Sequence, residues 1–151
     1  MDKPVFDLDH FLPYLLNQAA EATSKSFQAT YKSAYGMTRT QWRVLANLGK
    51  FGSMTARDIC RLSHMEKTKV SRAVAALESD GLLSRAPSPQ DRRAEILALT
   101  QRGRAVFDDL GQRAIDYDCS LRAQFGPEIA AQVEALLRRI IAEGPVDSDE
   151  D

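Results

Sequence analysis

The pattern of apolar and polar residues divides the 151-residue chain into six segments with the 3.6-residue period of a helix and two with the two-residue period of a strand. We expect helices over residues 13 to about 33, 38 to about 50, 55–62, 66–79, 100 to about 124 and 128–143. The strands are expected over residues 82–86 and 94–99. The chain is therefore predicted to be mainly α, with one small β-hairpin.

Capping residues mark where several of these helices begin and end. Thr38, with Gln41 three residues later, forms the capping-box pattern of a helix start. Thr55 and Thr100 stand directly before two further helices, where a hydroxyl can accept a hydrogen bond from a free backbone N–H. Glycines that can close or break helices follow at Gly36, Gly81 and Gly126.

The middle of the chain has the layout of a winged helix-turn-helix. A break at Ser63-His64-Met65 separates two short helices, and the second carries polar and basic residues in its first two turns. The hairpin follows directly. Its loop, residues 87–93, ends in a basic tip and contains two prolines, which stiffen it and exclude it from the centre of a sheet. A hairpin of this kind after a helix-turn-helix is a wing, so we predict a DNA-binding domain over residues 37–100.

The flanking segments are predicted to serve assembly. Residues 1–36 and 101–143 carry apolar stripes that a winged-helix core of about 65 residues cannot cover well, so we interpret them as N- and C-terminal dimerisation helices. The alternative is a monomer that folds these helices back on itself. Residues 144–151 are rich in acidic residues and are predicted to form a disordered tail.

The basic residues are concentrated in the middle of the chain, which suggests a polyanionic partner. The whole chain is 44% hydrophobic and 27% charged, as in ordinary soluble globular proteins, and its formal net charge is −1. Residues 38–104 hold 13 basic and 6 acidic residues, whereas the remainder holds 7 basic and 15 acidic ones. A basic middle between acidic ends favours nucleic acid as a partner. Chance clustering on a solvated face would give the same count.

Several classes of protein are disfavoured. No apolar run approaches the roughly 18 residues of a membrane span, and the start lacks the layout of a signal peptide, so we expect a cytoplasmic protein without a membrane partner. Cys60 and Cys119 are too few for a disulfide framework and are expected to be buried, unreactive thiols. His10 and His64 lie far from each other and from both cysteines, so no metal and no cofactor is predicted.

Four segments carry a family resemblance when taken in order. They are Phe11-Leu12-Pro13-Tyr14-Leu15, then Thr40-Gln41-Trp42-Arg43-Val44-Leu45, then Val70-Ser71-Arg72 through Leu77-Glu78-Ser79-Asp80-Gly81-Leu82, and finally Asp91-Arg92-Arg93-Ala94 leading to Leu99-Thr100. With these segments the chain resembles the multiple-antibiotic-resistance-regulator (MarR) family of winged-helix transcription factors over about residues 8–142. The resemblance implies an obligate homodimer that presents two winged helices to double-stranded DNA.

The recognition helix is expected to contact the bases. Its outward-facing polar residues are predicted to meet DNA, because the apolar positions between them must face the core. These residues are Lys67, Thr68, Lys69, Ser71 and Arg72. Arg72 matches a family position that often reaches a base edge, and its planar donor fork suits guanine O6 and N7.

The wing and two further arginines complete the predicted interface. Arg93 matches the family arginine that enters the minor groove, and Asp91 matches the acidic residue that orients it. Arg92 is expected at a backbone phosphate, as are Arg57 and Arg85, and such contacts position the protein without specifying sequence.

The resemblance also implies a small-molecule signal. Many members of the family release DNA when a small aromatic or phenolic anion binds between the dimerisation helices and the winged helix. Tyr14, Trp42, Arg43 and Tyr117 could supply rings and a cation for such a pocket. Tyr14 and Trp42 lie on apolar stripes, so a plain core role is the alternative for both.

Two rival functions are weighed against DNA binding. An enzyme is disfavoured because no catalytic triad, phosphate-binding loop or metalloprotease motif is found. A protein-interaction module that reuses the winged helix without specific DNA binding remains the alternative, although its interface would favour apolar anchors over a basic tip. We predict a homodimeric, sequence-specific transcriptional regulator, a ligand-released repressor of a pseudo-palindromic operator.

Overall fold

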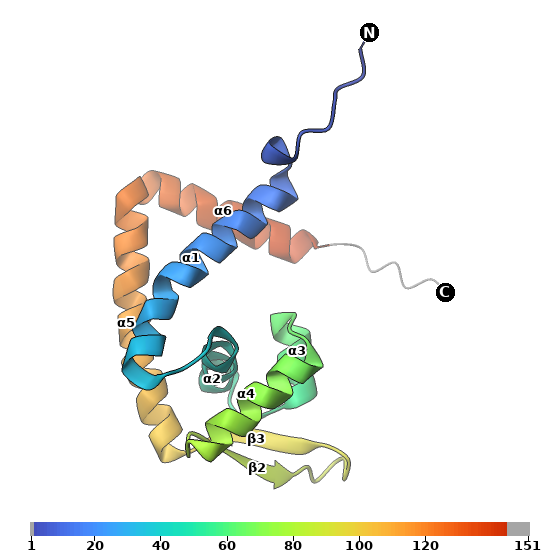
Figure 1. Ribbon diagram of the computed structural model, residues 1–151, viewed down its shortest axis with the longest axis vertical. Coiled ribbons are helices and arrows are strands. Elements are labelled where there is room, and N and C mark those ends of the chain that lie inside the picture. Colours follow the sequence, from blue (N-terminus) through green and yellow to red (C-terminus); the bar gives the residue numbers. More distant parts are fainter. Residues whose placement is uncertain (1, 145–151) are drawn as a thin grey trace. The chain divides into compact units, whose positions relative to one another are not determined.

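The computed structural model describes residues 2–144, which form two compact units divided between Gln112 and Arg113 (Figure 1). The helices are η1 (Leu8–His10, a 3-10 turn), α1 (Leu12–Tyr35), α2 (Arg39–Phe51), α3 (Ala56–Ser63), α4 (Lys67–Ser79), α5 (Gln101–Phe125) and α6 (Pro127–Glu143). The strands are β1 (Met54–Thr55), β2 (Leu83–Pro87) and β3 (Glu95–Leu99). The predominantly helical fold predicted from the periodicity is confirmed.

The predicted caps form as expected. Thr38 and Gln41 make both hydrogen bonds of the capping box at the start of α2. The Thr55 hydroxyl accepts from the Asp58 N–H at 3.1 Å, and the Thr100 hydroxyl accepts from the Gly103 N–H at 3.0 Å. The α1 helix ends at Gly36, whose left-handed φ of 63° a side chain would disfavour.

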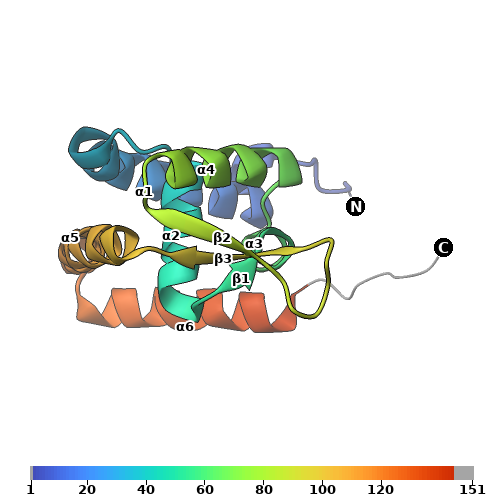
Figure 2. The same ribbon diagram turned by 90° about the horizontal axis from the view of Figure 1, so that it is seen from below.

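The hairpin belongs to a sheet with one more strand than predicted (Figure 2). All pairs are antiparallel in the order β1-β3-β2, with Met54 opposite Leu97 and Arg85 also opposite Leu97. The two-residue β1 was missed because so short a segment has no periodicity to detect. Pro87 closes β2 instead of opening the loop, and it is tolerated because β2 is an edge strand.

The core of the first unit joins the winged helix to the end of α1. Its fully buried side chains come from α2, α3, α4, β3 and α5, and include Leu45, Leu48, Ile59, Val70, Val74, Leu77, Leu97 and Leu110. The α1 helix adds Phe27 and Tyr31, and the Tyr31 ring stacks on Trp42 with 5.9 Å between ring centroids. Tyr35 at the end of α1 donates a 2.5 Å hydrogen bond to the Asp109 carboxylate of α5.

Two glycines allow close helix contacts in this unit. A Cβ built at Gly103 in α5 would lie 1.9 Å from the carbonyl oxygen of Leu82, at the entrance to β2. A Cβ at Gly49 in α2 would lie 2.3 Å from the Phe107 ring of α5. The first turns of α5 are thus fitted tightly against the winged helix.

The second unit contains the rest of α5 and α6. Gly126, with φ of 85°, and Pro127 end α5 and start α6, as predicted. Arg122 joins the two helices, because its guanidinium pairs with Asp118 at 2.8 Å and with Glu134 at 2.5 Å. The predicted acidic tail lies outside the described residues, apart from Gly144. No helix within residues 2–144 has the length and apolar composition that crossing a membrane requires.

Candidate DNA interface

The helix-turn-helix is formed by α3 and α4 with a tight turn between them. His64 caps α3 in the left-handed region at φ 52°, the one non-glycine residue among those described with a positive φ. The Met65 N–H donates to the Cys60 carbonyl at 3.3 Å, which closes the turn, and α4 begins at Lys67. The predicted break is confirmed one residue later than expected, at residues 64–66, and it fixes where the recognition helix starts.

The α4 helix has a buried face and a polar face, as its spacing predicted. Val70, Ala73, Val74 and Leu77 are buried, and Val70 and Leu77 are fully so. All five predicted DNA contacts on this helix are exposed, namely Lys67, Thr68, Lys69, Ser71 and Arg72. The apolar residues anchor α4 to the core and leave its N-terminal polar groups on the surface.

Local hydrogen bonds shape the tip of the wing. The Ser88 hydroxyl accepts from the N–H groups of Gln90 and Asp91, and the Ser88 N–H donates to the Ala94 carbonyl at 3.0 Å. The Asp91 carboxylate accepts from the backbone N–H of Arg93 at 2.9 Å. In this structure Asp91 therefore holds the backbone of Arg93, whereas the family resemblance implied that it orients the Arg93 guanidinium.

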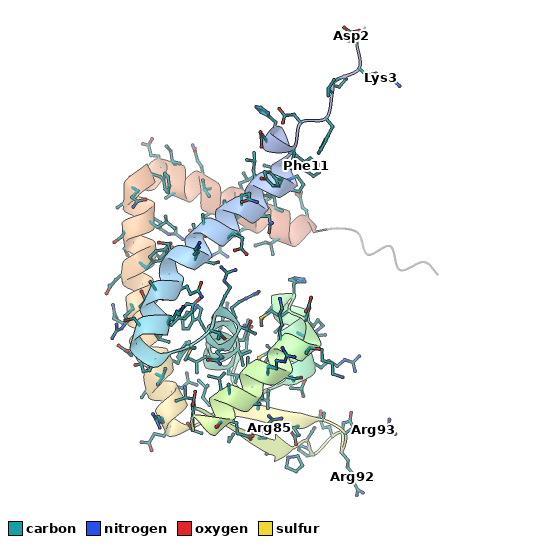
Figure 3. The ribbon with its side chains drawn as sticks, in the orientation of Figure 1. Asp2, Lys3, Phe11, Arg85, Arg92 and Arg93 are labelled. Atoms are coloured by element: carbon teal, nitrogen blue, oxygen red, sulfur yellow. The ribbon has the colours of Figure 1, made fainter. Side chains whose placement is uncertain are left out.

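Arg92 and Arg93 project from the hairpin tip into solvent (Figure 3). Neither forms an ion pair with any residue between 2 and 144, and the same holds for Arg57, Lys67, Lys69 and Arg72. Six of the predicted cations thus carry charge that nothing in the described chain neutralises. Arg85 differs, because it pairs with both Glu78 and Glu95.

Sequence reasoning missed Arg61. It lies four residues after Arg57 on the exposed side of α3 and forms an ion pair of 3.4 Å with Asp58. Arg57, Asp58, Cys60 and Arg61 line an open hollow on this helix. The i, i+4 spacing of the two arginines is the signal that would have revealed a second cation on the same helix face.

Two of the predicted pocket residues are already engaged. Trp42 is half-buried in a cluster with Phe27 and Tyr31, 5.6 and 5.9 Å away between ring centroids. The Arg43 guanidinium donates a 2.5 Å hydrogen bond to the carbonyl of Ser63, the last residue of α3. Tyr14 is half-buried on α1, and Tyr117 is half-buried on the part of α5 in the second unit.

The cysteines differ from expectation. The prediction of buried thiols is wrong for Cys119, which is exposed, while Cys60 is half-buried. Cys119 was expected to be buried because it lies in the long C-terminal helix, but its position on α5 is exposed in the single chain. Among the described residues, no three His, Cys, Asp or Glu side chains group closely enough to hold a metal ion.

The fold and its basic surface define a winged helix-turn-helix protein, and comparison with known proteins specifies which kind. The profile of the MarR family matches residues 35–94. The chain is 28% identical over 133 residues to the homoprotocatechuate degradative operon repressor of Escherichia coli, covering 88% of this chain and 89% of that protein.

Solved structures agree with the sequence match. The transcriptional regulator PA4135 superimposes with a TM-score of 0.81 at 28% identity, covering 89% of this chain and 98% of that one. The MarR family regulator SPO1453 of Silicibacter pomeroyi has a TM-score of 0.77 at 28% identity, covering 91% and 98% of the two chains. The family profile, the curated relatives and the solved structures together support the MarR family of transcriptional regulators.

Proposed function

We propose that this protein is a homodimeric repressor that binds a pseudo-palindromic operator and leaves it when a small aromatic anion binds. DNA binding is supported by six basic side chains on α3, the first turns of α4 and the wing tip. None of them forms an ion pair with a residue between 2 and 144. A cation without a carboxylate partner can neutralise phosphate and release counterions at no cost in broken ion pairs.

The six cations divide into two roles. Arg72 contacts a base edge in the major groove, since it lies on the exposed face of α4 and its fork matches guanine. Arg93 enters the adjacent minor groove, and the hydrogen bond from its backbone to Asp91 sets its direction. Lys67, Lys69, Arg57 and Arg92 contact phosphates, with Thr68 and Ser71 as short polar groups between them.

A second copy of the chain covers the apolar surface of α6. None of its residues is buried, and six large apolar side chains at helical spacing are exposed: Ile129, Val133, Leu136, Leu137, Ile140 and Ile141. Val5, Phe6, Leu8, Phe11, Leu12 and Leu15 add a second exposed apolar segment at the N-terminal end. Apolar surface of this extent marks a protein interface, and a symmetric dimer buries it on both chains.

The inducer is proposed from chemistry and from relatives of similar fold. NadR was solved in complex with 4-hydroxyphenylacetate, and DNA binding by BpsR is regulated by 6-hydroxynicotinic acid. Both molecules are small aromatic acids. In this chain Arg43 offers the cation, and a carboxylate that attracts Arg43 would remove its hydrogen bond from the Ser63 carbonyl, beside the turn that positions α4. Tyr14 and Trp42 supply rings for the same ligand.

The proposal is tested by selecting bound duplexes from a random library and titrating the selected sites at several salt concentrations. An inverted repeat with half-sites about one helical turn apart, bound by two chains far more tightly than random duplex, supports the repressor. Weak binding without sequence preference would favour the interaction module instead. We place this function in the cytoplasm, because the operator repressors that it resembles come from bacteria, where DNA lies in the cytoplasm.

A further inference from the structure

Arg85 is the one predicted phosphate contact whose charge is already compensated in the described chain. It lies on β2, and its Nε is 3.2 Å from a carboxylate oxygen of Glu78 in the last turn of α4. Its Nη1 is 3.3 Å from a carboxylate oxygen of Glu95 on β3. One guanidinium thus connects the recognition helix with both strands of the wing.

The strand register explains this geometry. Arg85 stands opposite Leu97, and Leu83 two residues earlier is buried, so Arg85 extends from the face of the sheet that packs on the helices. Glu95 is its diagonal neighbour on that face. Figure 3 places Arg85 beside α4, far along the hairpin from Arg92 and Arg93 at the tip. The Arg85 side chain is 33% exposed, and two carboxylates occupy its Nε and Nη1.

We propose that Arg85 is a positioning residue, which holds the wing at a fixed angle to the recognition helix by binding Glu78 and Glu95 together, and that it does not neutralise a DNA phosphate. This inference rests on the proposed function, because the wing and α4 must meet one duplex. A planar guanidinium can engage two carboxylates with separate N–H groups, whereas a lysine ammonium provides one compact charge. A phosphate at Arg85 would have to displace two carboxylates that remain close to it.

The proposal predicts that removing either glutamate charge weakens DNA binding, which is the opposite of the usual effect. Removing a carboxylate from a DNA-binding surface normally strengthens binding, because the polyanion is repelled less. If Glu78 and Glu95 hold Arg85 in place, Glu78→Gln and Glu95→Gln weaken operator binding instead. Each exposed pair is of modest strength, so we expect a two- to fivefold loss of affinity per variant.

The experiment measures operator affinity by fluorescence anisotropy at several salt concentrations, with the selected operator and the full chain. The variants are Arg85→Gln, Arg85→Lys, Glu78→Gln, Glu95→Gln and the double variant Arg85→Gln/Glu78→Gln. Asp80→Asn is the matched control, because Asp80 is an exposed carboxylate directly after α4 that forms no ion pair with any residue from 2 to 144. Thermal melts show whether each variant is folded.

The expected result is that both glutamate variants and Arg85→Lys bind two- to fivefold more weakly while Asp80→Asn binds as well as the wild type or better. The double variant loses no more than Arg85→Gln alone, and the salt slope of Arg85→Gln stays at the wild-type value. The proposal is overturned if Glu78→Gln strengthens binding as Asp80→Asn does, or if Arg85→Gln lowers the salt slope by about 0.9, the loss of one phosphate contact. A wild-type protein that binds no specific operator would contradict the proposed function. That outcome differs from those that contradict the role of Arg85, which all require a wild type that binds.

Discussion

The close approach of α5 to the winged helix makes Gly103 a sensitive position. A Cβ there would lie 1.9 Å from the Leu82 carbonyl oxygen, and contacts of Cβ atoms under 3.0 Å are essentially never observed. In Gly103→Ala the two segments must therefore separate by about 1 Å or distort. The same Leu82 oxygen accepts the Thr100 N–H at 3.1 Å, and the Thr100 hydroxyl donates to the Gly81 carbonyl at 2.6 Å. The separation weakens both of these bonds.

The free-energy change follows from three contributions. Overpacking costs about 1–3 kcal/mol, and loss of one backbone hydrogen bond costs about 1 kcal/mol. The better helix propensity of alanine returns about 1 kcal/mol. The net loss of unfolding free energy is about 2 kcal/mol, which corresponds to a fall in Tm of about 8 °C for a unit of this size.

Gly111→Ala in the same helix is the matched control. A Cβ at Gly111 meets no atom within 4 Å, so only the propensity contribution remains and the variant should be more stable by about 0.5–1 kcal/mol. Urea unfolding followed by circular dichroism measures both variants at one fixed protein concentration, because assembly adds to apparent stability. A Gly103→Ala protein as stable as Gly111→Ala would refute the argument.

Further predictions concern the interface, the assembly and the response to pH. Arg93→Ala should weaken operator binding and lower the salt slope, which titration at several salt concentrations measures; an unchanged slope and affinity would exclude the wing from the interface. Arg72→Ala should reduce discrimination by about 1–3 kcal/mol at one base pair per half-site, whereas an equal loss on all sequences would make Arg72 a phosphate contact. Leu137→Glu on the apolar stripe of α6 should shift the protein towards monomer in analytical ultracentrifugation, and Ala131→Glu on the opposite side of that helix should not. Hydrogen bonds from Arg122, and secondarily from Arg138, hold the pKa of Glu134 below its usual 4.5. The ionised Glu134 carboxylate therefore stabilises the fold above pH 4.5, and this stabilisation is lost as the pH falls through the lowered pKa. Glu134→Gln should therefore be less stable than the wild type at neutral pH but equal to it in strong acid, and a gap that persists in acid would contradict this.

Local signals predicted which residues of the proposed DNA-binding surface are exposed. The buried positions Val70, Val74 and Leu77 required the polar residues of α4 to face outward, and the structure has them exposed. The caps at Thr38, Thr55 and Thr100 form as predicted, because a cap depends on groups within three residues.

The environment of each cation was less predictable. Arg57, Arg85 and Arg92 all appeared in sequence as basic residues of one domain, yet Arg85 alone meets two carboxylates. Arg43 was predicted as the cation of a ligand pocket, and in the structure its guanidinium donates to the carbonyl of Ser63, twenty residues later. Side chains of this length reach partners that only the packing of whole elements brings near.

The sequence by itself determined the order of the helices, the winged helix-turn-helix, the polar face of α4 and the apolar stripe of α6. These features follow from periodicity, caps and turns, in which each residue acts on neighbours within one or two turns. The tertiary structure decided the third strand, the contact of Gly103 with Leu82, and the pairing that distinguishes Arg85 from the unpaired arginines of the tip. Those features depend on how α4, α5 and the hairpin pack, and close packing is a property of the assembled core that no single segment specifies.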